Sequence, residues 1–139
     1  MNQEFVDRAG EIVEKNTGMQ TYCTLGLIDT DGYPTASTIT ASKADGIKWI
    51  TFCTGLGSNK ASRIRECPHA SVCFNGSDYN ITLVGTMEIL TDSETKEEMW
   101  YEGLSNHFND AEDPNYCVLR LNTERYNLLI DWQEVRGEL

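Results

Sequence analysis

Short runs of strand-forming residues, separated by turn signals, occupy most of this 139-residue sequence. The run NITLVGTMEIL at 80–90 places large apolar side chains at alternate positions, as expected for a strand with one buried face. The Asp-Gly pairs in DTDGYP and KADG are typical of tight turns between antiparallel strands. Seven strands are therefore predicted, over 20–28, 35–42, 47–53, 69–75, 80–90, 116–121 and 125–133. The first three are expected to form an antiparallel meander.

Three short helices are predicted between these strands, over about 3–15, 58–66 and 91–103. Asn2 is a candidate N-cap for the first, and TDSE at 91–94 matches a capping box at the start of the third. Gly85 falls on the apolar face of its strand, where glycine indicates a notch, a bulge or room for a ligand. Many short strands and few helices predict a mainly β fold, a barrel or a sandwich, with 1–139 forming one domain.

The charge and cysteine content argue against several classes of protein. The net charge is −11, from 22 acidic and 11 basic residues. Nucleic-acid binding is not expected, because it requires a basic surface to neutralise phosphates. No apolar run approaches the length of a membrane span, and the N-terminal sequence lacks the features of a signal peptide. The five cysteines form no C-x-x-C pair and the histidines have no ligand cluster, so reduced thiols, a cytoplasmic location and no metal are expected.

The segment TFCTGLGSNKASRI at 51–64 is the strongest indication of a binding site. A strand-like run ends in Thr54 and two glycines, and Ser58 is placed to cap a helix. A helix N-terminus offers unpaired N–H groups and the positive end of the helix dipole to an anion. Lys60 puts a cation in the first turn, which the dipole disfavours unless an anion lies between them. The alternative is that Ser58 only caps the helix and Lys60 is a solvated surface charge.

The segment PTASTITAS contains hydroxyl side chains on both faces of one expected strand, next to the strand at 47–53. Buried hydroxyl groups are costly unless they are hydrogen-bonded. These side chains are therefore predicted to line a polar ligand site. Alternatively, one face of the strand is exposed and its threonines reflect β propensity. The four residues are Ser37, Thr38, Thr40 and Ser42.

The order of these motifs resembles the pyridoxamine 5′-phosphate oxidase-like flavoproteins, and especially their small general-stress-protein branch. The resemblance covers nearly the whole chain. Its most specific part is FCTGLGSNKASRI, in which an aromatic strand ending in Thr leads through a Ser-x-Lys-Ala turn into a helix. The resemblance implies an FMN-binding split β-barrel of antiparallel Greek-key type. It also implies a homodimer with two FMN molecules in the clefts between the subunits.

The resemblance further implies which residues bind the cofactor FMN. By position, the phosphate end would be bound by Thr54, Ser58, Asn59 and Lys60. The isoalloxazine ring would lie beside Ser37, Thr38, Ile39 and Thr40. Asn80 falls where the partner subunit often offers a polar side chain to the flavin.

Trp100 and Trp132 are expected in the core or at the dimer interface, and Trp132 is also a candidate for stacking near the flavin. Of the two histidines, His69 is expected to have a structural role. His107 lies in the loop after the third helix, and one alternative is that its side chain reaches a cleft.

Two departures from the family pattern refine these expectations. Many members carry basic residues near the positions of Ser37 and Ser42, so Lys60 is here the principal cation and FMN affinity is expected to be weak. Arg63, one turn further on, either assists Lys60 or is solvated. The C-terminal sequence LLIDWQEVRGEL lacks the Arg-Leu-His and Arg-Leu-Ala-Pro segments that hold the substrate phosphate in the true oxidase. Pyridoxamine phosphate oxidation is therefore not expected.

The resulting hypothesis is a flavin-dependent oxidoreductase of unknown substrate, which exchanges electrons with a small-molecule donor and acceptor. No residue stands out as an obligatory acid or base, so no catalytic residue is assigned. A second hypothesis is a flavin store or stress-response protein without catalysis. A third keeps the barrel and replaces FMN by a deazaflavin or haem.

Overall fold

A computed structural model describes residues 2–139, in which all pairs of hydrogen-bonded strands are antiparallel. The strands are β1 (Cys23–Ile28), β2 (Pro34–Ile39), β3 (Ala41–Asp45), β4 (Trp49–Gly55), β5 (His69–Asn75), β6 (Tyr79–Leu90), β7 (Tyr116–Ile130) and β8 (Gln133–Glu138). The helices are α1 (Asn2–Lys15), α2 (Asn59–Glu66) and α3 (Ser93–Glu98), followed by the 3₁₀ helix η1 (Glu102–Asn106). The prediction of a mainly β, antiparallel fold is confirmed.

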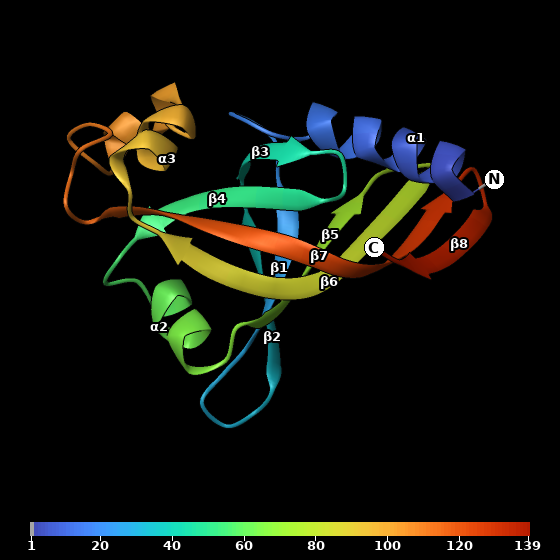
Figure 1. Cartoon of the computed structure of the whole chain (residues 1–139), viewed down its shortest axis with the longest axis horizontal. Helices are drawn as coiled ribbons and strands as arrows, with labels where there is room; N and C mark the ends of the chain where they lie inside the picture. The colour runs from blue at the N-terminus through green and yellow to red at the C-terminus, as the bar shows by residue number, and fades with distance from the viewer. Residues whose placement is uncertain (1) are drawn as a thin grey trace.

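The strands form one strongly curled sheet (Figure 1). Seven of them follow the order β2-β1-β5-β6-β7-β4-β3, and β8 pairs with the remaining part of β7. The two strands at the ends of this order, β2 and β3, are consecutive in the chain, with only Thr40 between them. The sheet must therefore curl far enough to bring the end of β2 to the start of β3 at Thr40. Because β2 and β3 do not pair with each other, the curled sheet is a half-barrel.

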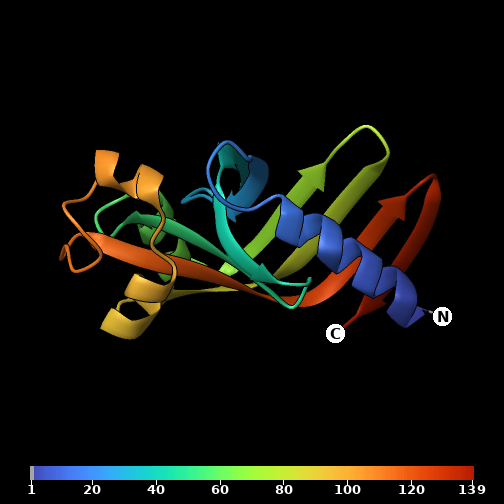
Figure 2. The same ribbon diagram turned by 90° about the horizontal axis from the view of Figure 1, so that it is seen from above.

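The helices lie outside this curled sheet and at its two ends. α1 packs against β3 and β7, whereas α2 packs against β1, β4 and β6. Seen from above, α1 lies at the end that carries β8, and α3 lies at the opposite end (Figure 2). Among residues 2–139, no helix combines the length and the hydropathy needed to cross a membrane.

The main hydrophobic core fills the inside of the half-barrel. Ile81, Leu83 and Met87 of β6 all point into it, as their alternation predicts. Gly85 shares this face, and the register of β6 against β7 shifts beside it. A Cβ atom on Gly85 would lie only 2.0 Å from the carbonyl oxygen of Asn122. Glycine is therefore required at a β-bulge, one of the three roles that its position in the strand indicates.

A second, smaller core lies outside the half-barrel and is called the outer cluster. It consists of the buried residues Met99, Leu104, Phe108, Tyr116 and Val118. Trp100 packs against it, with its ring edge-on to Tyr116 at 5.4 Å between ring centroids. The expectation that Trp100 belongs to a core is therefore confirmed.

The predicted meander is wrong, because segment 35–42 forms two strands rather than one. β2 pairs with β1 at one edge of the sheet, and β3 pairs with β4 at the other. The chain passes between them at Thr40, whose hydroxyl group donates a hydrogen bond to the carbonyl of Thr21 at 2.9 Å. The polar strand therefore changes edges at this corner, and Ser37 and Thr38 do not lie next to β4.

Three further features differ from prediction. The segments 116–121 and 125–133 belong mainly to one continuous strand, β7, because the bulge near Glu124 lets pairing continue through a polar stretch. The final strand, β8, was not predicted. The third helix is also shorter than 91–103, and Asp92 rather than Thr91 caps it by accepting a hydrogen bond from the N–H of Thr95 at 3.0 Å.

Candidate functional site

The turn between β4 and α2 has the hydrogen bonding expected at a helix N-terminus. The Oγ of Ser58 accepts a hydrogen bond from the N–H of Ala61 at 3.2 Å, and the hydroxyl of Thr54 donates to the same oxygen at 3.2 Å. The prediction that Ser58 caps α2 is confirmed. The N–H groups of Asn59 and Lys60 belong to the first turn, where they have no intrahelical partner. These two groups can donate to an anion.

Lys60 supplies a positive charge at the same place. It is half-buried, and the first turn of α2 contains no acidic residue. Across residues 2–139 the structure gives Lys60 no ion-pair partner. Because the helix dipole also disfavours a cation in this turn, Lys60 is placed to bind an external anion.

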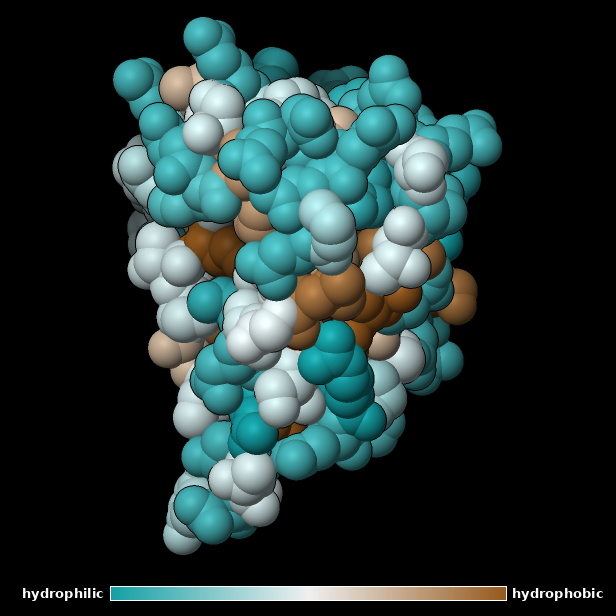
Figure 3. Space-filling view, turned by 90° about the vertical axis from the view of Figure 1, so that its left-hand side faces the viewer, coloured by the Kyte–Doolittle hydropathy of each residue, from teal (hydrophilic) through white to brown (hydrophobic). Residues whose placement is uncertain are grey.

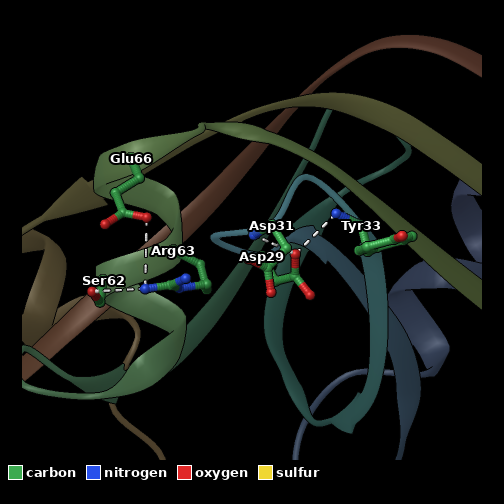
Figure 4. A network of polar contacts seen from close by, with 6 residues as sticks. All are labelled: Asp29, Asp31, Tyr33, Ser62, Arg63 and Glu66. Carbon is green, nitrogen blue, oxygen red and sulfur yellow. Dashed lines mark hydrogen bonds and ion pairs between the residues drawn. The ribbon is translucent and has the colours of Figure 1, made fainter.

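Arg63 has a different environment from Lys60. Its side chain is only 14% exposed, and its guanidinium group lies 3.6 Å from the carboxylate of Glu66 and 3.5 Å from the hydroxyl of Ser62 (Figure 4). Its Nε atom is buried without a hydrogen-bond partner among the described residues. Arg63 is therefore mostly buried and is not the solvated surface charge considered as one alternative.

A cavity of about 420 Å³ lies beside this turn and is called the α2-side cavity. On the side of the molecule that carries α2 and α3, hydrophobic residues gather between hydrophilic ones (Figure 3). Three predicted residues line the cavity, namely Ile39, Thr40 and Thr54. Ser58 is connected to it through its hydrogen bond with Thr54. The tertiary structure thus brings the β2–β3 corner close to the end of β4.

The opposite wall of the α2-side cavity comes from residues that sequence reasoning mostly missed. They are Tyr101, Leu104, His107, Phe108 and Asn115, from the segment between α3 and β7. Only His107 was considered, and its alternative location in a cleft is confirmed. This irregular, acidic segment has neither helical nor strand periodicity, so no sequence signal placed it against β4.

The ionisable groups of this cavity include a thiol and a phenol that remain neutral at pH 7. Burial raises the pKa of Cys53, and hydrogen bonding to Tyr116, whose hydroxyl lies 3.6 Å from the sulfur, opposes this only in part. Burial also raises the pKa of Tyr101. Because a nucleophilic cysteine must form a thiolate, Cys53 is unsuited to nucleophilic catalysis.

The remaining hydroxyl residues of PTASTITAS lie elsewhere. Ser37 and Thr38 are exposed on β2, an edge strand with exposed residues on both faces. Ser42 is buried on β3 and shares a hydrogen bond of 2.6 Å with the hydroxyl of Thr51. Pairing with Thr51 accounts for the burial of Ser42, so this hydroxyl group has a structural role.

Asn80 and Trp132 line a second cavity, of about 300 Å³, called the hairpin-end cavity. Its other lining residues are Asn75, Gly76, Ser77, Asp78, Tyr79 and Leu129. Trp132 is 85% exposed and lies with Asp131 in the two-residue turn between β7 and β8, where both residues have positive φ. A core location for Trp132 is therefore wrong, because a tight turn at the sheet edge holds its ring outside.

The two cavities lie far apart within one chain. Thr54 pairs with Cys117 of β7, whereas Asn80 pairs with Leu129 of the same strand. These β7 residues are twelve positions apart, which corresponds to roughly 40 Å along an extended strand. A mononucleotide cannot contact both groups of predicted residues in a single copy of the chain.

Comparison with known proteins relates this fold to one family. The family model described as pyridoxamine 5′-phosphate oxidase matches residues 11–130. Among solved structures, a Clostridium acetobutylicum protein related to general stress protein 26 has a TM-score of 0.83 and 23% identity, over 100% of this chain and 97% of that chain. No curated protein sequence matches the chain.

Two other solved structures share the fold and belong to proteins described by a ligand that they bind. A Nostoc punctiforme protein, described as pyridoxamine 5′-phosphate oxidase-related and FMN-binding, has a TM-score of 0.70 and 13% identity, over 99% of this chain and 95% of that chain. A haem-binding protein from Mycobacterium smegmatis has a TM-score of 0.74 and 16% identity, over 96% of this chain and 57% of that chain. The family match extends over most of the sequence and agrees with the curled antiparallel sheet. The chain therefore belongs to the pyridoxamine 5′-phosphate oxidase family and has its split-barrel fold.

Proposed function

We propose that the protein binds FMN and is a flavin-dependent oxidoreductase that acts on small molecules. The observation that carries this proposal is Lys60, a first-turn cation without an ion-pair partner among residues 2–139. Its helix follows Thr54 and Gly55, which line a cavity of hydroxyl and apolar groups, although Lys60 itself is not among the lining residues. This combination of groups suits a phosphate ester on a flat ring system. Bound FMN would supply the redox chemistry, and the protein would bind and orient it.

The residues present fit the phosphate end of FMN. The open N–H groups of Asn59 and Lys60, the hydroxyl of Thr54 and the charged residue Lys60 all belong to the β4–α2 turn or to the first turn of the helix. Ser58 shapes this turn through its cap bond. Backbone amides and a cation at a helix N-terminus form a suitable phosphate site.

The α2-side cavity also fits a ring. Its volume of about 420 Å³ lies within the usual range of ligand sites. Ile39 and Thr40 would lie along the ring edge, and Leu104 and Phe108 offer apolar surface on the opposite wall. These groups would exclude water from one side of the ring, while the neutral Tyr101 could donate a hydrogen bond.

A homodimer would complete this site. Asn80 and Trp132 are too distant from Thr54 to contact the same ligand within one chain. Trp132 nevertheless exposes a large aromatic ring at a backbone conformation that non-glycine residues rarely adopt. We therefore assign the hairpin-end cavity of one copy to the flavin held by the α2-side cavity of its partner. Ser37 and Thr38, on the exposed edge strand β2, are candidates for the same interface.

Haem is the second candidate ligand, and a specific observation favours it. His107 lines the α2-side cavity, and imidazole is a common axial ligand of haem iron. The M. smegmatis relative shows that this fold occurs in a haem-binding protein. A deazaflavin, or an FMN store without catalysis, remains compatible with the same residues. The visible spectrum of the loaded protein distinguishes flavin from haem, and turnover of a reduced nicotinamide with an acceptor distinguishes an enzyme from a store.

The test of FMN binding is titration of the purified protein and its Lys60→Glu variant. Losing a charged hydrogen bond and adding a repulsive charge is expected to weaken FMN binding by about 100-fold. The control is Lys43→Glu, which makes the same charge change at an exposed position on β3 and should leave binding unchanged. Both variants should keep the melting temperature of the parent. Identical FMN titration curves for Lys60→Glu and the parent would remove Lys60 from the site and overturn the proposal.

A further inference from the structure

The segment 101–115, which forms one wall of the α2-side cavity, is called the strap. It runs from the end of α3 to the start of β7 and contributes Tyr101, Leu104, His107, Phe108 and Asn115 to the cavity. Its apolar residues are anchored in the outer cluster. The strap is therefore a folded part of the site, and its attachment to the α2 turn can be traced through individual hydrogen bonds.

Asn115 connects the strap to the turn that leads into α2. Its backbone carbonyl accepts a hydrogen bond from the N–H of Leu56 at 2.7 Å, and its Oδ1 accepts from the N–H of Gly57 at 3.4 Å. Its side-chain amide also lies 3.0 Å from the position that a Cβ atom on Gly55 would occupy. Asn115 thus forms hydrogen bonds with two of the three residues between Thr54 and the cap Ser58, and it would crowd a side chain at the third.

Asp113 in turn holds Asn115. Its carboxylate accepts hydrogen bonds from the backbone N–H groups of Asn115 at 2.9 Å and Asn109 at 3.0 Å. These two bonds close the C-terminal half of the strap into a compact loop. The orientation of Asn115 therefore depends on the Asp113 carboxylate.

A buried cation holds the backbone of Asp113. Lys96 of α3 is 7% exposed, and its Nζ donates a hydrogen bond of 3.0 Å to the carbonyl of Asp113. The same ammonium group lies 5.4 Å from the centre of the Tyr116 ring. A buried ammonium group is costly without hydrogen bonds, so the bond to Asp113 strongly favours one position of the strap relative to α3.

We propose that Asn115 is a positioning residue for the anion-binding turn, that Lys96 and Asp113 fix Asn115, and that the strap thereby makes the site selective for phosphorylated over non-phosphorylated flavin. The inference rests on the proposed function for its ligand. Its physical basis is that Asn115 acts on Gly55–Gly57, next to the groups assigned to the phosphate. Of the residues assigned to the ring, Ile39 and Thr40 lie outside the strap, and Leu104 and Phe108 are held by the outer cluster, so these contacts do not depend on this turn.

The test is the ratio of FMN affinity to riboflavin affinity, since riboflavin lacks the phosphate. Asp113→Ala is expected to weaken FMN binding about tenfold, and Asn115→Ala about threefold, with riboflavin binding unchanged. The control Asn109→Ala keeps the backbone N–H that bonds to Asp113 and should change neither affinity. Equal losses for both flavins would show general loosening of the cavity and would overturn the selectivity.

Amide hydrogen exchange in the ligand-free protein tests the same contacts without flavin. Exchange at Leu56 and Gly57 should become at least several-fold faster in Asp113→Ala, and exchange at Gly57 should become faster in Asn115→Ala. Unchanged exchange at both amides would overturn the role of Asn115. If the parent binds no FMN, the proposed function and the selectivity both fail, and exchange still decides whether Asn115 holds the turn. If the parent binds FMN and the affinity ratio does not change, only the inference fails.

Discussion

The α2-side cavity and the hairpin-end cavity differ in what supports them. The first lies beside two hydrophobic cores, and its turn is fixed by the Ser58 cap and by Asn115. The second lies at the β7–β8 turn, where Trp132 is exposed. One cavity is therefore a half-site supported by packed elements next to the α2 turn, and the other is an exposed aromatic half-site.

The hairpin end is also the more weakly held of the two. Arg8 and Asp131 form an ion pair there, but both side chains are about half exposed, and exposed pairs contribute little stability. The N–H of Asp131 donates to the carbonyl of Asp78 at 2.9 Å, and both Asp131 and Trp132 have positive φ. An exposed tryptophan at a strained position is unfavourable for an isolated chain, so this difference supports a role for the turn in binding. Three experiments test the comparison, beginning with the largest expected effect.

Gly85→Ala should disturb the ladder that joins the two cavities. The new methyl group would meet the backbone of Asn122, which cannot move without breaking β6–β7 pairing. A loss of about 3 kcal/mol or more in the free energy of unfolding is expected from denaturant titration. Gly57→Ala is the control, because its methyl group would enter open space. If the Gly85→Ala protein is as stable as the parent and binds FMN with the same affinity, the bulge does not determine how the two cavities are placed relative to each other.

Mixing two defective variants should restore binding if the half-sites belong to different copies. Lys60→Glu damages the α2-side cavity, and Trp132→Ala damages the hairpin-end cavity. Each variant alone is expected to bind FMN about tenfold or more weakly than the parent. A mixed dimer contains one site with both residues intact, so tight binding should reappear in about half of the sites of that dimer. Failure of every mixture to regain tight binding would contradict a shared site.

Trp132→Gly should separate stability from binding at the hairpin end. Glycine adopts positive φ without the cost paid by other residues, so the free energy of unfolding should rise by about 1 kcal/mol. FMN affinity should fall in the same variant, because the ring is lost. A control variant at a second exposed aromatic residue, Tyr22→Gly, should show no such gain in stability. A stability gain without any loss of affinity would remove Trp132 from the flavin site.

Much of the fold could be predicted because its signals are local. The strand at 69–75 and the helix ending at residue 66 were predicted within one residue, since alternation, the Ser58 cap and Pro68 act within a few positions of the chain. The break at Thr40 could not be predicted in this way. Thr40 lies inside a uniformly strand-forming segment, and only the meeting of the two sheet edges makes it a corner.

The candidate site also has one part that could be predicted from the sequence and one part that could not. Thr54, Ser58 and Lys60 are close in sequence, so their grouping around one turn followed from the motif. Tyr101 and Asn115 approach that turn only because α3 and the outer cluster carry the strap back over β4. FMN binding by the ten residues named from the sequence stays a prediction, and the experiments above test it.

The amino-acid sequence alone determined the mainly β class, the capped helix after β4 and the family resemblance, since each depends on short local motifs and on their order along the chain. The tertiary structure decided which edges of the sheet meet, where the strap lies and how far Asn80 is from Thr54. These relations depend on strand pairing and packing between residues that are distant in the chain, and no short segment encodes them by itself.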